Sequence, residues 1–167
     1  MQNSTNGKSR ATRAQYLSFR IGGDDYAVDI LRVQEIRGWE TVRALPDSKN
    51  YVKGVLDLRG AIVPIIDLRI RFGCDSPEYA PTTVVIVMSM GPPEQPQQLV
   101  GAVVDGVSDV LDVEVDELKP APQIGGTVSR RYLQGMVTLP RGMVILLDLD
   151  RMFDSSELDG LYDAAGG

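Results

Sequence analysis

The sequence contains no histidine, and this absence removes much of ordinary enzyme chemistry. Histidine is the commonest general base near neutral pH, and it activates the serine or cysteine nucleophile in many catalytic pairs. It is also a ligand in most zinc sites, and a phosphohistidine carrier cannot work without it. The chain also lacks a phosphate-binding P-loop and a glycine-rich dinucleotide motif. The sequence therefore argues against several large enzyme classes.

Cysteine and long apolar runs are scarce as well. Cys74 is the only cysteine, so no internal disulfide can form, which fits a reducing cytosol. No apolar run approaches the roughly 18–20 residues that are needed to span a bilayer. The basic residues Lys8, Arg10 and Arg13 are not followed by the apolar stretch of a secretory signal. We therefore expect a soluble, cytoplasmic protein with no segment inserted in the membrane.

The charge balance is acidic, with 17 Lys and Arg against 23 Asp and Glu and a net charge of −6. A nucleic-acid-binding protein needs a basic face to neutralise phosphates, so we expect no nucleic-acid partner. The hydrophobic fraction of 43% is typical of a globular protein. A chain of 167 residues can form one domain or two small subdomains that share a core.

The strongest local signal is a predicted β-hairpin in the first half of the chain. Two apolar runs, residues 54–58 and 61–66, are joined by Arg59 and Gly60. Glycine supplies the positive φ that a tight hairpin turn needs. Because the runs are apolar almost throughout, both faces of these strands are expected to be covered. Arg59 is then a large cation at the tip of an apolar hairpin.

A second copy of this stretch lies downstream, with Tyr132 standing opposite Tyr51 at an offset of 81 positions. The other matches are Asp67 with Asp148, Phe72 with Phe153 and, after a one-residue slip, Arg59-Gly60 with Arg141-Gly142. A second, weaker set of matches pairs Ile30, Val33, Glu35 and Ile36 with Val104, Val107, Asp109 and Val110. The ordered set of matches indicates an internal duplication, hence two related β subdomains.

Most of the remaining chain has the composition of short strands separated by turns, which predicts a mainly β fold of paired small barrels. The expected strands are residues 16–21, 26–30, 82–90, 99–104, 107–115 and the hairpin 132–148. Residues 31–37 predict a bent strand or one helical turn. Residues 1–14 are polar and expected to be a disordered tail. Residues 151–162 have helical spacing, so we expect a C-terminal helix within the final segment, 154–167.

Carboxylates are the one catalytic group left to consider. Four of them, Asp57, Asp67, Asp105 and Asp148, lie at predicted strand ends, where Asp is also an ordinary turn former. The acidic run from Asp109 to Glu117 lacks the spacing of a calcium loop and suits a solvated strand edge. Asp24 and Asp25 follow two glycines, so a carboxylate-dependent metal or nucleotide enzyme is the alternative hypothesis. A plain hairpin turn is the simpler interpretation of these two residues.

Several segments, in order, resemble the CheW family of bacterial chemotaxis coupling proteins. They are residues 26–38 (YAVDILRVQEIRG), 52–69 (VKGVLDLRGAIVPIIDLR), 83–87 (TVVIV) and 104–110 (VDGVSDV). The resemblance covers about residues 16–153. Two departures are visible: Asp57 stands where asparagine is common, and the proline-rich connector 91–98 is longer than usual. A CheA kinase or a CheV protein needs further domains, so the resemblance is to a standalone coupling protein.

The resemblance implies two small SH3-like, five-stranded β-barrels around a shared hydrophobic core. We expect a single domain over residues 15–153, with an approximate division between the subdomains near 75–82. It further implies a non-catalytic adaptor without a cofactor. Such an adaptor links the cytoplasmic tips of methyl-accepting chemoreceptors to the regulatory domain of the histidine kinase CheA.

The resemblance also implies a receptor-binding surface, whose residues are Val33, Glu35, Ile36, Gly54, Arg59, Val84 and Val85. A receptor tip is a helical hairpin, and an amphipathic helix binds by laying apolar residues into a groove that Val33 and Ile36 could line. Arg59 could donate directional hydrogen bonds to a carboxylate or to helix-end carbonyls. The alternative for Val84 and Val85 is core packing, and for Gly54 it is close backbone packing. Kinase-binding residues cannot be assigned from the sequence.

Overall fold

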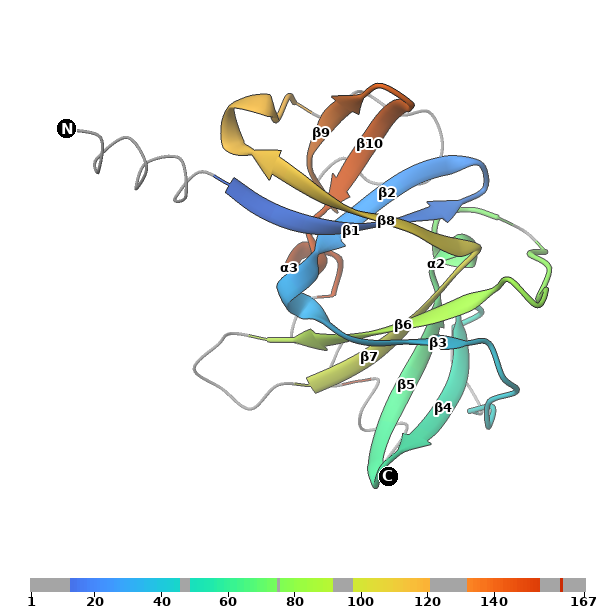
Figure 1. Ribbon diagram of the computed structural model, residues 1–167. Coiled ribbons are helices and arrows are strands. Elements are labelled where there is room, and N and C mark those ends of the chain that lie inside the picture. Colours follow the sequence, from blue (N-terminus) through green and yellow to red (C-terminus); the bar gives the residue numbers. More distant parts are fainter. Residues whose placement is uncertain are drawn as a thin grey trace.

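The computed structural model describes residues 13–45, 49–74, 76–91, 98–120, 132–153 and 160, and within them it contains two five-stranded sheets (Figure 1). Sheet A comprises β1 (Arg13–Ile21), β2 (Asp24–Asp29), β8 (Gly106–Glu114), β9 (Leu133–Leu139) and β10 (Gly142–Leu147). Sheet B comprises β3 (Val33–Gly38), β4 (Val52–Leu58), β5 (Ala61–Asp67), β6 (Val84–Met90) and β7 (Gln98–Val104). The described residues also form four short helices: η1 (Ile30–Arg32), α2 (Leu68–Arg71), η2 (Val115–Glu117) and α3 (Leu149–Met152). The predicted mainly β fold is confirmed.

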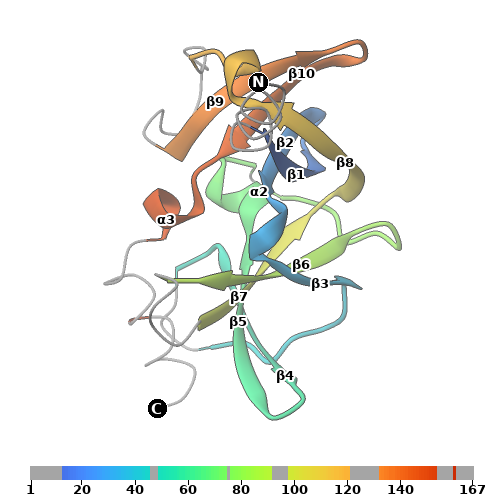
Figure 2. The ribbon, with the colours of Figure 1, turned by 60° about the vertical axis from the view of Figure 1, so that its left-hand side comes forward.

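The two sheets have the same topology, which confirms the duplication. Sheet A has the order β8-β1-β2-β10-β9 and sheet B the order β3-β6-β7-β5-β4. In each, the pairings along the order are antiparallel, antiparallel, parallel and antiparallel. Sheet B is one continuous piece of chain, whereas sheet A is built from both ends (Figures 1 and 2). The sheets therefore do not divide near residues 75–82, and that expected boundary needs correction.

The matched residues make matched hydrogen bonds in the two halves. The backbone N–H of Asp67 donates to the Tyr51 carbonyl at 2.7 Å, and that of Asp148 donates to the Tyr132 carbonyl at 2.8 Å. Each Asp side chain then caps the helix that follows, α2 or α3. The offset of 81 read from the sequence is thus a structural equivalence between β4–β5–α2 and β9–β10–α3.

Each sheet is curled towards a closed form by one isolated bridge at its outer strand. Arg43, after β3, bridges to Val55 on β4, and Lys119, after β8, bridges to Met136 on β9. These bridges satisfy backbone groups at the free edge of each sheet, which an open edge would leave to water or to another chain. This closure produces the two SH3-like barrels, in agreement with the expected fold.

The barrels share one apolar core. It joins buried residues of sheet A, such as Phe19 and Ile145, to buried residues of sheet B, such as Ile66 and Met88. One smaller cluster around Tyr16 lies in sheet A and one around Val63 lies in sheet B, and each fills its own barrel. Both faces of β5 are covered as the sequence predicted, because its alternate residues enter the shared core and the core of sheet B. The fold therefore depends on the two halves packing together.

The expected hairpin is present as β4 and β5, joined by the predicted tight turn at Arg59 and Gly60. Both central residues have positive φ, 51° at Arg59 and 88° at Gly60, which is the conformation of the two-residue turns that suit twisted hairpins. The Asp57 side chain accepts a hydrogen bond from the Gly60 N–H at 3.0 Å. The carboxylate at position 57 therefore stabilises the tip that presents Arg59.

The chain ends were predicted less well. The N-terminal tail was expected to extend to residue 14, but β1 begins at Arg13. The predicted bend or helical turn at 31–37 is confirmed as η1 followed by β3. Most of the expected C-terminal helix and the proline-rich residues 92–97 lie outside the described residues. What the structure shows at the end of sheet A is the four-residue helix α3.

A buried ion network, which we call the buried joint, connects the two barrels. The Arg69 side chain, 2% exposed, donates through Nε and an Nη atom to both oxygens of Asp67, at 3.0 and 2.9 Å. Its other Nη atom donates to Asp105 at 2.9 Å. Asp105 in turn accepts from the N–H of Gly22, in the β1–β2 turn of sheet A, at 2.8 Å. Arg69 of sheet B is thereby tied to sheet A.

The electrostatics of the buried joint keep its arginine charged. Burial acts to lower the pKa of Arg69, but hydrogen bonds and charge attraction from Asp67 and Asp105 outweigh it and raise the pKa overall. The Tyr79 hydroxyl donates to Asp67 at 2.6 Å. Burial and this hydrogen bond together raise the pKa of Tyr79 well above its ordinary value. The joint is therefore fully paired only with Arg69 protonated and Tyr79 neutral.

We predict that Arg69→Met lowers the free energy of unfolding by about 3–5 kcal/mol, because Asp67 becomes an unpaired buried charge. Urea unfolding followed by circular dichroism measures the change. Arg13→Met is the matched control, since it breaks an exposed pair with Glu114 and should cost at most about 1 kcal/mol. Equal losses in the two variants would contradict a structural role for the buried joint.

Tyr79 should also make stability pH-dependent in alkali. Its pKa is raised in the folded state, so the stabilisation is complete below the unfolded-state pKa of about 10 and is lost as pH rises above it. Urea midpoints of wild type and Tyr79→Phe, measured between about pH 8 and 11, test this. The variant should lose less stability over that range, with a residual loss from Tyr16 and Tyr26, whose pKa values burial also raises. Parallel pH profiles would refute the assignment.

Candidate functional site

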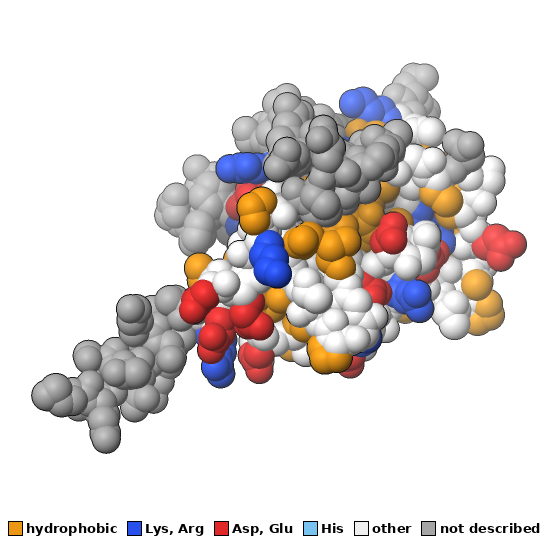
Figure 3. Space-filling model, turned by 90° about the horizontal axis from the view of Figure 1, so that it is seen from above, with side chains coloured by type: hydrophobic (Ala, Val, Ile, Leu, Met, Phe, Trp, Pro, Cys, Tyr) orange, Lys and Arg blue, Asp and Glu red, His pale blue; other side chains and the backbone are white. Residues whose placement is uncertain are grey.

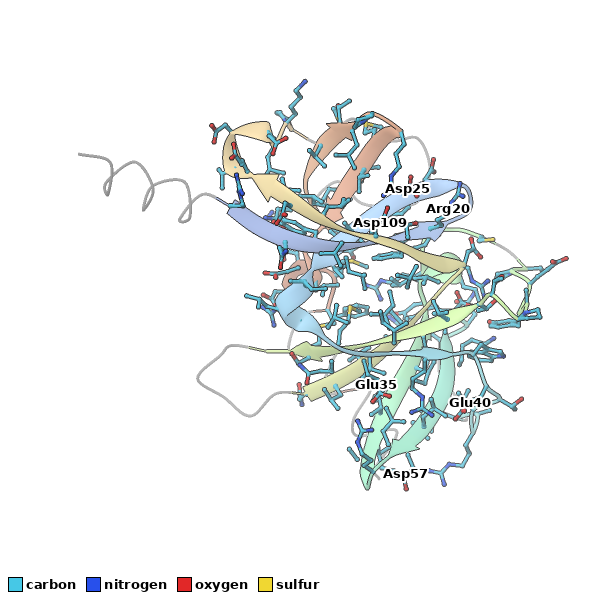
Figure 4. All side chains as sticks on the ribbon, in the orientation of Figure 1. Arg20, Asp25, Glu35, Glu40, Asp57 and Asp109 are labelled. Atoms are coloured by element: carbon cyan, nitrogen blue, oxygen red, sulfur yellow. The ribbon has the colours of Figure 1, made fainter. Side chains whose placement is uncertain are left out.

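An ion pair joins the hairpin tip to β3. An Nη atom of Arg59 donates to one carboxylate oxygen of Glu35 at 2.7 Å, and Arg37 donates to the other oxygen at 3.2 Å. The Arg59 side chain is 79% exposed and the Glu35 side chain 25%. Figure 4 shows Glu35 on the side of sheet B from which the β4–β5 hairpin, labelled at Asp57, extends. Two predicted site residues that are 24 positions apart are thus brought into contact.

Glu35 is held in its charged form by this arrangement. The hydrogen bond from Arg59 is the largest influence and lowers the pKa of Glu35, while partial burial opposes it and Arg37 adds to the lowering. Arg59 uses one donor in the pair, and its guanidinium carries five N–H groups in all. The carboxylate therefore fixes the position of a cation that still faces solvent.

The apolar side chains of the predicted site lie on the other face of sheet B from Glu35, since Ile36 pairs with Ile86 of the shared core whereas Glu35 pairs with Val87 of the sheet B core, and their exposure is unequal. Ile36, the neighbour of Glu35 on β3, is an exposed large hydrophobic residue, 46% accessible. Val33 and Val84 are half-buried and pack against the shared core. β3 and β6 are paired, with Ile36 opposite Ile86 and Gly38 opposite Val84. Strand β3, at the edge of sheet B, thus carries an exposed apolar residue on one face and a fixed ion pair on the other, and both are features suited to contact with another protein.

Gly54 and Val85 are buried, which favours the packing alternative for both, and their contact with a partner stays a prediction. Val85 is 0% exposed and belongs to the core of sheet B. Gly54 is buried with φ at 148°, and a Cβ there would come within 2.0 Å of the Arg43 carbonyl oxygen. Both are therefore packing positions in this fold.

Sheet A contains an ion pair equivalent to Arg59–Glu35, which was not predicted from the sequence. Arg141, at the β9–β10 hairpin tip, donates to Asp109 on β8 at 2.7 Å. The residue after Asp109, Val110, is 54% exposed, much as Ile36 follows Glu35. The signal was present in the sequence, since Asp109 and Val110 matched Glu35 and Ile36, and Arg141 matched Arg59. The two halves therefore present two similar tips with different surroundings.

The carboxylates of the alternative enzyme hypothesis do not form a metal site among the described residues. Asp25 lies 3.8 Å from Arg20 across the β1–β2 hairpin (Figure 4). Asp24 is exposed at the start of β2. The parts of the chain that the structure describes contain no group of three or more Cys, Asp or Glu residues able to hold a metal ion. Nothing in the geometry brings a third ligand to these two residues.

The acidic run along β8 and η2 is a solvated surface. Asp112, Asp116 and Glu117 are exposed, and Glu114 pairs with Arg13 at 2.8 Å. Figure 3 shows acidic side chains gathered at one side of the face seen from above.

Among the described residues, no helix has the length and apolar composition that crossing a bilayer requires.

Comparison with known proteins decides the family. The family model described as a CheW-like domain matches residues 15–157. The chain belongs to the CheW family. It is 43% identical over 144 residues to the "Chemotaxis protein CheW" of Klebsiella aerogenes, covering 86% of this chain and 84% of the relative. It is 36% identical to the "Probable chemotaxis protein CheW" of Rhizobium etli, with 86% and 89% covered.

A solved structure supports the fold. The scaffolding protein TtCheW from Thermoanaerobacter tengcongensis superposes with a TM-score of 0.74 at 24% sequence identity, covering 86% of this chain and 94% of that one. The two-barrel architecture is therefore that of a CheW protein. As a member of the CheW family, this chain is a chemotaxis coupling adaptor.

We predict that Gly54→Ala destabilises the protein by more than about 1 kcal/mol, because the new methyl group would clash with the Arg43 carbonyl at a backbone φ that favours glycine. Chemical denaturation measures the loss. The equivalent Gly135→Ala is the matched control, since its Cβ would lie 3.0 Å from the Lys119 carbonyl, so a smaller loss is expected. A larger loss at Gly135 would show that the close approach at Gly54 is not decisive.

Proposed function

We propose that this CheW-family protein joins the cytoplasmic tips of methyl-accepting chemoreceptors to the regulatory domain of the histidine kinase CheA. It acts in the cytoplasm by holding receptor and kinase in a shared geometry, and it catalyses no reaction. The observation that carries the receptor half of this proposal is the Arg59–Glu35 ion pair at 2.7 Å on β3, the strand that also carries the exposed Ile36.

The receptor would bind through its helical tip. An amphipathic helix can lay apolar side chains against Ile36, Val33 and Val84, which lie on the paired strands β3 and β6. Arg59 would donate its remaining N–H groups to a carboxylate or to carbonyls at the end of a helix. Because Glu35 already holds the guanidinium, binding would order fewer side-chain torsions of Arg59.

The kinase would bind elsewhere on the barrels, at exposed loop ends and strand edges. An adaptor of this kind needs two separable surfaces, since both partners must be bound at once. Changes at the receptor surface should therefore weaken one complex and spare the other. That separation is the property that distinguishes a coupling protein from a general binding module.

The test is co-sedimentation with a receptor signalling-domain fragment and, separately, with the kinase regulatory domain. We predict that Arg59→Ala weakens receptor binding by about tenfold or more, which is the scale of losing a central interface arginine, and leaves kinase binding unchanged. Arg141→Ala is the matched control, because it removes the equivalent tip arginine and its 2.7 Å ion pair from sheet A.

Each outcome has a definite meaning. Loss of receptor binding in the Arg59 variant alone supports the proposed surface. Equal losses in the two variants would show that the surface is not confined to sheet B. If wild type binds neither partner, the proposed function is wrong.

A further inference from the structure

The two barrels are connected by a second polar joint on the other side of the molecule, which we call the exposed joint. An Nη atom of Arg32, in η1, donates to Asp150 of α3 at 2.6 Å. Its other Nη atom donates to the carbonyls of Ser89 and Gly91, at 3.4 and 3.2 Å. Arg32 thereby ties α3, at the end of sheet A, to the end of β6 in sheet B. In Figure 1, α3 lies on the left and α2 on the right.

The duplication makes the two joints equivalent by position and opposite in charge. Arg69 and Asp150 correspond at the offset of 81 that relates α2 to α3. Strands β1 and β6 are also equivalent, because Phe19 pairs with Val107 in sheet A and Met88 pairs with Val33 in sheet B. Gly22 and Gly91, each three residues further along, therefore correspond. The helix thus supplies the cation to the buried joint and the anion to the exposed joint.

The two joints differ strongly in contact with water. At the buried joint the Arg69 side chain is 2% exposed; Asp67, in the same half, is 0% exposed, and Asp105, which carries the link to sheet A, is 41% exposed. At the exposed joint the side chains of Arg32 and Asp150 are 24% and 57% exposed. A pocket of about 200 Å³ also opens beside Arg32 and Asp150. Water can replace the lost partners at the exposed joint, whereas separation of the buried joint would leave the buried Arg69 with only one of its two carboxylates.

From this asymmetry we propose that the two barrels pivot about the buried joint and separate first at the exposed joint. The shared core keeps the rotation small, because large opening would expose apolar residues of both sheets. The pocket beside Arg32 and Asp150 gives these two side chains space to move apart or closer together. The buried joint remains intact during this movement.

The exposed joint lies next to the proposed receptor surface along the chain. Arg32 is the last residue of η1, and Val33 begins β3, which also carries Glu35 and Ile36. A partner held on β3 would therefore act on the joint through one peptide bond. The effect of a bound partner on the exposed joint rests on the proposed function. The pivot itself does not, and it can be tested without a partner.

The test measures distances between spin labels in the full chain with Cys74 replaced by Ser. One labelled pair, Gln15→Cys with Gln98→Cys, uses the starts of β1 and β7, on the left of Figure 1 beside the exposed joint. The other pair, Asp24→Cys with Thr82→Cys, uses the first residue of β2 and the turn before β6, on the side of the buried joint, to the right in Figure 1. Electron–electron double resonance gives a distance distribution for each pair.

Arg32→Gln should broaden the Gln15–Gln98 distribution and shift it to longer distances, while the Asp24–Thr82 distribution stays unchanged. Asp150→Asn, which keeps the side-chain shape, should have the same effect. Arg151→Gln is the control, since it removes a neighbouring arginine of α3 whose ion pair among the described residues is with Asp148, at 3.5 Å within the same helix turn. Unchanged distances in both joint variants, or equal broadening of both labelled pairs, would overturn the pivot.

Discussion

Arg69 is a charged residue with almost no contact with water, and the relation between the two barrels depends on how that charge is satisfied. Asp67 meets it with both oxygens, Asp105 accepts from its remaining Nη atom, and Asp105 also holds the β1–β2 turn of the opposite sheet. A buried cation tolerates few arrangements of its partners, because each lost hydrogen bond leaves a desolvated charge. The network therefore specifies an orientation that the non-directional apolar core alone would not.

Internal duplication explains why most structural features of the molecule occur twice. The two copies of each feature nevertheless differ in their surroundings. The hairpin tips, the helix-capping aspartates and the edge bridges recur in both halves. The two halves differ in the charge and burial of the joints and in the surroundings of the two hairpin tips. A scaffold that binds two different partners needs such asymmetry, since identical surfaces would bind identical partners.

The proposed coupling surface is built on rigid elements. Glu35 is on a strand paired with β6, and Arg59 is at a two-residue turn that Asp57 holds by a hydrogen bond. Such preorganisation reduces the entropy lost on binding, so a small exposed surface can give specific contact without a reaction centre. An adaptor requires only that its surfaces keep their geometry while both partners are bound.

The sequence by itself determined the duplication, the β4–β5 hairpin and most strands, because these follow from local patterns: turn glycines, apolar runs and repeated spacing. The family motifs carried Glu35, Ile36 and Arg59 as candidates. Tertiary structure alone decided that Gly54 and Val85 lie inside, that Arg59 meets Glu35, and that Arg69 is buried between the barrels while Arg32 is not. Burial and charge pairing arise between residues distant in the chain, and the sequence pattern around each arginine does not record which residues surround it.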